Sequence, residues 1–492
     1  MATMKSTDAL LFVLIFVALL LRVLLSPPIW HHGEAREGLV VQAIVHNHEW
    51  ILPFRNGDLP SKPPLFHWIA ALTASLFGLS DAAVRLPSAI GAEVMAIATF
   101  LLGRSMGGRK TGWLAVGALL GIYEFWDSGV DARVDMTFAA CVTVSLTGFY
   151  FWYRAGGERA RVTCYIAAAF AVLAKGPAGI VLPGIVIVGF LAAQGQLRFI
   201  WKLWSWSLAG IVLLIDLGWY VLAYQIGGNA FFGLQIEQEN VGRALGSGFS
   251  TRNNVFTWTS WLATRMMPWC LVLIFSFIRR FRGEPEDSAG RFLHAWWIAI
   301  FGVFALAASK RAVYLLPLYP AIALLAARAI NAMIPAQSVG LRAARFPRDG
   351  SPTRLTLARA IGAGILLFDL TLMVASSDVW RDAKQRQARL AFVEAINKII
   401  PTQIPLFATP EVGNPSIMVI AYRLRRRIDS APINCAEPNA YFLAPLDGGN
   451  LAQAEAQILA SSKVHEISLV RVLSDKPPAP NSECVRNAPY DS

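Results

Sequence analysis

Charge is scarce in this sequence. Only 15% of its 492 residues are Asp, Glu, Lys or Arg, whereas 55% are hydrophobic, and the mean hydropathy is +0.47. Soluble globular domains carry about 25% charged residues, so the composition excludes that class. The apolar residues gather in repeated runs of about 17 or more, the length that a helix needs to cross a bilayer. The sequence therefore predicts a multi-spanning α-helical membrane protein.

Cysteine and histidine are also few, and their positions are uneven. Of the five cysteines, Cys435 and Cys484 lie in polar sequence near the C-terminus. If that segment faces an oxidising compartment, these two could form a disulfide, and a pair of free thiols is the alternative. The seven histidines include five between the first two long apolar runs, namely His31, His32, His46, His48 and His67. Polar chemistry is therefore concentrated in that first loop.

The positive charge is spread along the chain. The net charge is +12, but Lys and Arg occur in small groups between apolar runs, so no nucleic-acid partner is predicted. The positive-inside rule places the Arg-rich loops and the N-terminus in the cytoplasm. The alternate loops and everything after about residue 377 are then expected on the periplasmic side of a bacterial inner membrane. The Arg-rich loops are 104–110, 154–161, 198–202, 279–282 and 342–354.

We expect about eleven spans. The first run precedes Pro27 and Pro28 without a small-residue cleavage site, so it is interpreted as an uncleaved helix and not as a signal peptide. The amphiphilic stretch 65–79 is too short for a span and is predicted to lie at the membrane interface. The predicted spans are 9–26, 84–103, 111–126, 136–153, 163–175, 177–194, 205–224, 258–278, 291–308, 313–330 and 356–376.

The composition changes near Asp378, beyond which no run is long enough to span a membrane. Periodicity predicts helices at 385–400 and 451–461 and strands at 404–408, 440–444 and 465–473. The sequence therefore predicts two parts. The first is a membrane domain, residues 1–376, whose outer loops carry the chemistry, and the second is a small extracytoplasmic α/β domain, residues 377–492.

Ionisable residues that border apolar runs on the predicted outer side are the candidates for a binding site. A charge at this depth is costly unless an opposite charge compensates it. A lipid phosphate would need several such cations, whereas pairing with Glu34, Glu37, Asp131 and Asp135 is the alternative. The candidate substrate-binding residues are Arg36, Lys62, Arg133, Glu239, Asn240, Arg243, Lys310, Arg311 and Tyr314.

Carboxylates in the same loops are the candidates for catalysis. A transferase at this surface needs a carboxylate that accepts the acceptor's proton and cations that stabilise a phosphate leaving group. Glu34 and Asp135 are the first candidates for the carboxylate, and Glu37 is a third that could instead pair with Arg36. His31 and His32 could hold a divalent metal beside Glu34, although adjacent residues seldom point at one ion. No other cofactor is predicted.

A series of short motifs occurs in a fixed order, at residues 33–38, 61–68, 132–135, 173–177, 239–243 and 309–317. Together they resemble the membrane glycosyltransferases of the GT-C class, in particular the bacterial aminoarabinose transferases for lipid A and the relatives of protein O-mannosyltransferases, glycosyltransferase families 39 and 83. The resemblance implies a sugar donor on a polyprenyl monophosphate and inversion at the anomeric carbon. It also implies an Asp-Glu pair in the first loop, but here Gly33 stands at the Asp position and leaves Glu34.

A lipid or solute transporter or flippase is the alternative function, because many spans with charged residues also suit transport. Against it, the charges gather at one predicted surface, and no inverted repeat is visible. A scaffold without catalytic activity is a third alternative. The sequence leaves the sugar open, and it leaves the acceptor open among a lipid A-type glycolipid, an envelope polysaccharide and a protein.

Overall fold

The computed structural model describes residues 5–242, 254–282, 285–308, 310–333, 383–433, 437–446, 456–463 and 466–473. The chain divides into two compact units. Unit 1 comprises Met1–Leu25, Ser61–Phe66 and Arg85–Ser376. Unit 2 combines the C-terminal part with two N-terminal segments, and comprises Ser26–Pro60, His67–Val84 and Ser377–Ser492. The predicted boundary at residues 376 and 377 lies outside the described ranges.

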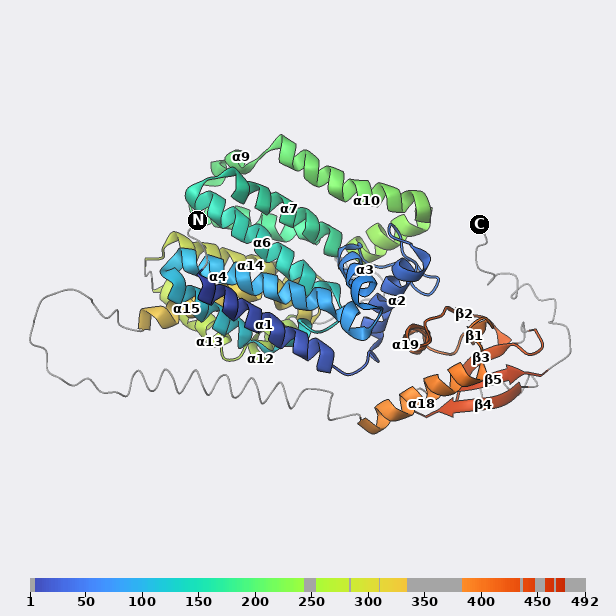
Figure 1. Cartoon of the computed structure of the whole chain (residues 1–492). Coiled ribbons are helices and arrows are strands. Elements are labelled where there is room, and N and C mark those ends of the chain that lie inside the picture. The colour runs from blue at the N-terminus through green and yellow to red at the C-terminus, as the bar shows by residue number, and fades with distance from the viewer. Residues whose placement is uncertain are drawn as a thin grey trace, which may run out of the picture. The chain divides into compact units, whose positions relative to one another are not determined.

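Unit 1 is built from helices (Figure 1). Some of the α-helices are joined by other helical segments. These are the 3₁₀ helices η1 (Leu197–Phe199) and η3 (Ala312–Leu318) and the π-helix η2 (Gly233–Gly242). The α-helices are α1 (Ser6–Leu25), α4 (Asp81–Leu120, whose first turn belongs to unit 2), α5 (Tyr123–Ser128), α6 (Val134–Ala155), α7 (Glu158–Lys175), α8 (Ala178–Ala193), α9 (Ile200–Leu203), α10 (Trp206–Phe232), α12 (Val255–Arg265), α13 (Cys270–Phe281), α14 (Ser288–Leu306) and α15 (Tyr319–Met333).

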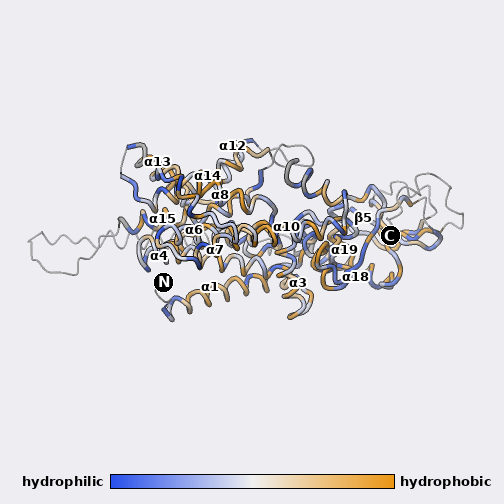
Figure 2. The backbone as a smooth tube through the Cα atoms, turned by 90° about the horizontal axis from the view of Figure 1, so that it is seen from above, coloured by the Kyte–Doolittle hydropathy of each residue, from blue (hydrophilic) through white to orange (hydrophobic). Residues whose placement is uncertain are grey.

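The structure confirms a polytopic helical membrane fold. Within the described residues, six helical segments are long and apolar enough to cross a membrane, and α1, one of them, is largely hydrophobic along its length (Figure 2). Leu65–Phe77 (α3) and α8 are shorter apolar helices. The predicted number of spans is not confirmed, and the predicted span 356–376 lies outside the described residues. The six segments are Ser6–Leu25, Asp81–Leu120, Val134–Ala155, Trp206–Glu239, Ser288–Leu306 and Ala312–Asn331.

Two predicted spans have different limits in the structure. The break expected between 84–103 and 111–126 occurs inside α4, where Gly108 has a φ of 84° that glycine adopts without strain. The second half of α4 ends at Leu120, and residues 123–128 form the separate helix α5. The predicted span 258–278 is wrong as a single helix, because α12 ends at Arg265 and α13 starts at Cys270. Pro268 lies between them, and proline lacks the N–H that a continuous helix needs.

Helices α6 and α7 are antiparallel and pack closely. A two-glycine turn joins them, and a Cβ at Gly148 of α6 would lie 2.6 Å from the backbone nitrogen of Cys164 in α7. The Ser145 hydroxyl also donates a hydrogen bond to the Cys164 carbonyl at 2.8 Å. Small residues allow such close approach between membrane helices. As a result, the start of α6 lies beside the end of α7, which carries Lys175.

Unit 2 contains a five-stranded sheet in the order β2-β1-β3-β5-β4. Strand β1 pairs in parallel with β2 and β3, and β5 pairs antiparallel with β3 and β4. The core includes Phe442, Val470 and Val472, and the Phe407 and Phe442 rings stack at 5.3 Å. Helix α18 packs against β4 (Figure 1). The elements are α18 (Ala383–Ile399), β1 (Leu406–Ala408), α19 (Asn414–Leu424), β2 (Ile428–Ser430), β3 (Tyr441–Pro445), β4 (Ala456–Ser462) and β5 (Ile467–Val472).

The predicted α/β character of the C-terminal part is confirmed, with one wrong element. Strands β1, β3 and β5 and helix α18 lie where the sequence predicted them. The helix predicted at 451–461 is wrong over its described residues, because residues 456–462 form strand β4 along β5, and ladder pairing outweighs the high helical propensity of this Ala-rich segment. Helix α19 and strand β2 were not predicted, although Pro415 in the first turn of α19 is a typical helix start. The disulfide predicted between Cys435 and Cys484 lies outside the described residues.

The first loop is more regular than predicted, because residues 32–47 of it form helix α2 (His32–Asn47). Tyr422 of α19 lies against this helix. Its carbonyl accepts a hydrogen bond from the Gln42 amide at 2.9 Å, and its hydroxyl donates one to Asp81 at 2.8 Å. Asp81 also pairs with Arg423 at 2.8 Å. These contacts hold α2, the helix that carries Glu34 and Glu37, against the C-terminal α/β part of unit 2.

Replacement of Gly38 tests this packing. A Cβ at position 38 would lie 2.4 Å from the Tyr422 ring, so Gly38→Ala should destabilise the protein by about 1 to 3 kcal/mol through overpacking. Thermal unfolding in detergent measures the change. Gly413→Ala is the matched control, because its Cβ would meet only Pro415 at 3.7 Å. The cost of Gly38→Ala should fall when Tyr422 is also replaced by Ala, and additive costs would show that the two residues do not press on one another.

Candidate functional site

Asp135 and Lys175 form the centre of a charged cluster in unit 1. Asp135 lies in the first turn of α6 and Lys175 is the last residue of α7, and their side chains form an ion pair. The Lys175 ammonium also lies 4.3 Å from the centre of the Tyr314 ring and 5.2 Å from that of Phe138, distances at which a cation and an aromatic face attract each other. Both charged side chains are mostly buried, at 12% and 13% exposure.

A second buried pair joins Lys62 to Glu239 of η2, again with both side chains nearly covered. The charge of Lys62 acts on Asp135, and so does that of Arg133, which pairs with Asp131 at 2.9 Å. The structure therefore brings together several residues that the sequence predicted as a site, although each cation is already compensated by a carboxylate of the protein. They are Lys62, Arg133, Asp135, Glu239 and Tyr314.

The other predicted substrate-binding residues of unit 1 differ in position. Lys310 is buried and donates a hydrogen bond to the Ala307 carbonyl at 2.6 Å, whereas the neighbouring Arg311 is exposed at the start of η3. Asn240 belongs to η2 by its backbone, and its side chain lies outside what the structure describes. Arg243 also lies outside the described residues. The predicted roles of these four residues therefore stay predictions.

The structure adds charged residues that the sequence-based site did not include. Lys175 is one of them. Glu124 of α5 is another: its side chain is 2% exposed and forms an ion pair with Arg265 of α12. The negative charges of Asp127 and Asp135 also act on Glu124. The signal for Glu124 was present, because an acid at the end of an apolar run needs a partner, but the partner comes from a helix 141 residues away.

Glu37 of unit 2 is fully engaged by its neighbours. One carboxylate oxygen accepts two hydrogen bonds from the Arg36 guanidinium, at 2.5 and 2.9 Å, and the other lies 2.7 Å from His67 Nε2. Burial by itself would raise the pKa of Glu37. The charge of Arg36 and the contact with His67 have a larger effect in the opposite direction, so the pKa of Glu37 lies well below its usual value. A carboxylate with so low a pKa is a weak proton acceptor, so Glu37 and Arg36 are better suited to holding α2 in place.

Glu34 lies in the first turn of α2 and is buried, with 7% exposure. Both oxygens of Glu37 are engaged by Arg36 and His67, so Glu34 is the stronger candidate for direct chemistry of the two acids on α2. The α2 acids and the unit 1 cluster belong to different compact units, and each is described by itself.

The metal site expected at His31 and His32 is not supported by their geometry. His31 Nδ1 accepts a hydrogen bond from the Gly33 N–H at 3.2 Å and so caps α2, which leaves this nitrogen engaged by the backbone. The two rings lie against each other with centres 4.9 Å apart. Among the residues that the structure describes, no group of three or more His, Cys, Asp or Glu side chains has a metal-binding arrangement.

Residues 61–220 match the family described as dolichyl-phosphate-mannose-protein mannosyltransferase. A curated relative is the undecaprenyl phosphate-α-4-amino-4-deoxy-L-arabinose arabinosyl transferase of Shewanella sediminis, which is 26% identical over 69% of this chain and 62% of its own length. A protein of Pseudomonas fluorescens with the same description, numbered 1, is 24% identical over 82% of this chain and 70% of its own. The chain spans about three fifths of the length of the first two curated relatives, 62% and 60%.

Solved structures share the fold. The crystal structure of ArnT from Cupriavidus metallidurans bound to undecaprenyl phosphate has a TM-score of 0.75 and 17% identity, over 96% of this chain and 99% of that one. The Archaeoglobus fulgidus oligosaccharyltransferase has a TM-score of 0.55 and 12% identity, over 90% of this chain and 69% of that one. The chain thus has the fold of the GT-C membrane glycosyltransferases. Within that class, the resemblance to the aminoarabinose transferase type is confirmed.

The Asp135–Lys175 pair makes a prediction about stability. Asp135→Asn or Lys175→Met alone leaves one mostly buried charge without its partner, which should cost about 3 to 5 kcal/mol. The double variant should cost less than the sum of the two, because it leaves neither charge. Unfolding in detergent measures all three. Glu158→Gln, which breaks the exposed Glu158–Arg161 pair, is the control and should cost about 1 kcal/mol or less. A similar small cost for Asp135→Asn would contradict a structural role for the buried pair.

Proposed function

We propose that this protein is a membrane glycosyltransferase that moves a sugar from a polyprenyl-phosphate donor to an acceptor in the cell envelope. The reaction is placed on the periplasmic face of a bacterial inner membrane. The names of the curated relatives and the undecaprenyl phosphate of the Cupriavidus structure support the donor class. A lipid A-type glycolipid, a polysaccharide and a protein all stay open as acceptors. The observation that carries the proposal is the cluster of buried cations around Asp135.

The cluster suits a phosphate that arrives from the membrane. Lys62 and Lys175 are mostly buried, and each is held by a carboxylate from a distant part of the chain. A bound phosphate could take the place of Glu239 at Lys62 without leaving the ammonium uncompensated. Lysine binds phosphate as a compact positive charge, and its attraction is stronger at a site that excludes water. A donor that enters from the bilayer reaches such a site without passing through water.

The chemistry follows from these charges. The acceptor's oxygen attacks the anomeric carbon of the sugar, and the bond from that carbon to the phosphate oxygen breaks. The electron pair leaves with the phosphate, whose added negative charge is stabilised by the lysines of the cluster. The proton of the acceptor passes to a carboxylate. No nucleotide sugar takes part, and each sugar transferred releases one polyprenyl phosphate.

Glu34 is the residue that we assign as the proton acceptor. Asp135 is a direct partner of Lys175, and a carboxylate that holds an ammonium accepts a proton poorly. Glu37 has donors on both oxygens. We therefore assign Asp135 to the orientation of Lys175 and Glu37 to the orientation of α2. This ranking keeps all three predicted carboxylates in the mechanism but gives them different tasks.

A transporter is not favoured. In secondary transporters, binding sites lie near the middle of the bilayer and are formed by interrupted helices. Here Asp135 and Lys175 lie at the very ends of α6 and α7, at a helix boundary. The charges are thus placed for a reaction at a membrane surface.

Donor binding tests the assignment of Lys62. Lys62→Gln should weaken the binding of undecaprenyl phosphate by about 30-fold to several thousand-fold, the range for loss of one buried charged contact. Titration into the detergent-solubilised protein, followed by tryptophan fluorescence, measures the affinity. Glu239→Gln should keep or increase the affinity, because it removes the carboxylate that competes for Lys62. Lys110→Gln, at an exposed position, is the control. Wild-type affinity in Lys62→Gln would remove this residue from the site.

Turnover tests the assignment of Glu34. Glu34→Gln keeps the shape of the side chain but cannot accept a proton, so kcat should fall about a hundred- to ten-thousand-fold while donor affinity is unchanged. The assay needs the acceptor, which mass spectrometry of envelope lipids and glycoproteins from a deletion strain would identify. If Glu34→Gln turns over normally, Glu34 is not the proton acceptor and the ranking of the three carboxylates is wrong.

A further inference from the structure

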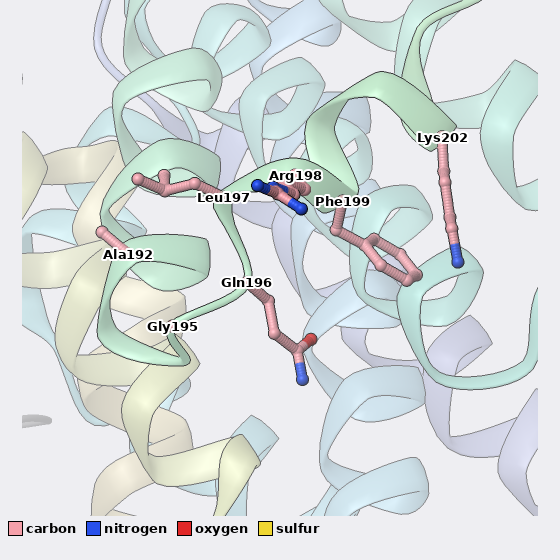
Figure 3. Close-up of a pocket in the computed structure, with 7 residues that line it drawn as sticks. All are labelled: Ala192, Gly195, Gln196, Leu197, Arg198, Phe199 and Lys202. Atoms are coloured by element: carbon pink, nitrogen blue, oxygen red, sulfur yellow. The ribbon is translucent and has the colours of Figure 1, made fainter.

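A second cationic feature of unit 1 lies in the connection between α8 and α10. A hollow of about 510 Å³ is lined there by Gln196, Arg198, Phe199 and Lys202, among other residues (Figure 3). The Lys202 side chain extends beside the Phe199 ring, with its ammonium 5.1 Å from the ring centre. None of these residues belongs to the cluster around Asp135.

The hollow and the Asp135 cluster lie at opposite ends of the same helices. The Tyr153 hydroxyl, near the end of α6, donates a hydrogen bond to Gln196 at 3.1 Å, whereas Asp135 lies in the first turn of α6. A helix rises about 1.5 Å per residue, so these two positions of α6 are roughly 27 Å apart. The hydrocarbon core of a bilayer is about 30 Å thick. The hollow therefore faces the leaflet opposite to the candidate transfer site.

The cations of the hollow differ from those of the Asp135 cluster in their pairing. Arg198 and Lys202 are both exposed, and neither side chain has a carboxylate partner in the part of the chain that the structure describes. Lys62 and Lys175, by contrast, are each neutralised by an acid of the protein. Two uncompensated cations beside one hollow favour an external anion as the ligand.

Exposed aromatic side chains show which kind of anion fits. Trp201 and Trp206, on either side of Lys202, are 76% and 81% exposed, and Trp204 between them is 45% exposed. Leu197 at the hollow is 50% exposed. Tryptophan gathers at the level of the lipid headgroups, where its ring contacts acyl chains and its N–H contacts water. A small soluble anion would not need this apolar border, whereas a phospholipid would use both parts.

We propose that this hollow is a binding site for the phosphate headgroup of an anionic phospholipid in the leaflet opposite to the transfer site. Arg198 offers a planar pair of N–H donors to the phosphate oxygens, Lys202 adds a compact charge, and the Gln196 amide can donate beside them. The exposed Trp and Leu side chains then contact the acyl chains. The bound lipid fixes the η1 and α9 segment to the membrane surface. This inference is independent of the sugar transfer proposed for the other end.

Native mass spectrometry of the full-length protein tests the site. The wild-type protein, delipidated in detergent, is titrated with phosphatidylglycerol, phosphatidylcholine or inorganic phosphate. Each cation near a membrane surface contributes about a fivefold factor, so Arg198→Gln with Lys202→Gln should weaken the binding of phosphatidylglycerol about 30-fold. Lys110→Gln with Arg159→Gln is the matched control, because it removes two exposed cations from other loops predicted on the same face. This control should keep the affinity of the wild-type protein.

Three results would overturn the inference. An equal loss in the control would show a general effect of surface charge. Equal binding of phosphatidylcholine would show that the net negative charge of the lipid is not recognised. Displacement of phosphatidylglycerol by inorganic phosphate at the same concentration would show a site for free anions that makes no use of the apolar border.

Discussion

The ion pair between Asp135 and Lys175 is the contact on which the charged cluster of unit 1 depends. It joins the start of α6 to the end of α7 at a membrane boundary, where an unpaired charge costs several kcal/mol, of the order of 3 to 5. The pair can form because the antiparallel helices approach closely at Gly148, which sets their relative height. Lys175 in turn lies over Tyr314, so the position of η3 follows from the same pair. The packing of α6 against α7 therefore also determines the geometry of the charged cluster.

Pairing of charges also bears on how the cations of the candidate site are compensated. Cations beside apolar runs need compensation, and sequence reasoning assigned it mainly to a bound phosphate, with intramolecular pairing as the alternative. In the described structure Lys62, Lys175 and Arg265 each pair with a carboxylate of the protein. Of these three carboxylates, Asp135 is the one that the sequence predicted as a partner. These two states are compatible, because a phosphate that displaces a carboxylate keeps the charge balanced. Under the proposed function, the acids would act as internal substitutes for the charge of the donor phosphate.

Much of the fold could be predicted from local pattern. Long apolar runs fix most membrane helices, and alternating apolar residues gave strands β1, β3 and β5. The features that the sequence did not predict correctly depend on partners that are distant in sequence. Strand β4 is Ala-rich and becomes a strand only because β5 lies beside it, and the pair of Glu124 with Arg265 joins α5 to α12. The prediction for the first loop was wrong for a different reason. Its acids, histidines and glycines indicate an irregular loop, but the side chain of His31 caps the start of a regular helix.

Helix α2 also bears on the position of Gly33, where the resembling family has an aspartate. Positions 33 and 34 both lie in the first turn of α2, so a carboxylate at either one benefits from the helix start. Successive helical residues, however, point about 100° apart around the axis, and Glu is one methylene longer than Asp. If Glu34 does the work of the missing Asp, its oxygens approach the acceptor from a different direction than an aspartate at position 33 would. A change of this size alters which acceptor hydroxyl can be reached, since proton transfer needs hydrogen-bond distance. Under the proposed function, the acceptor of this protein therefore does not follow from that of a relative with the Asp-Glu pair.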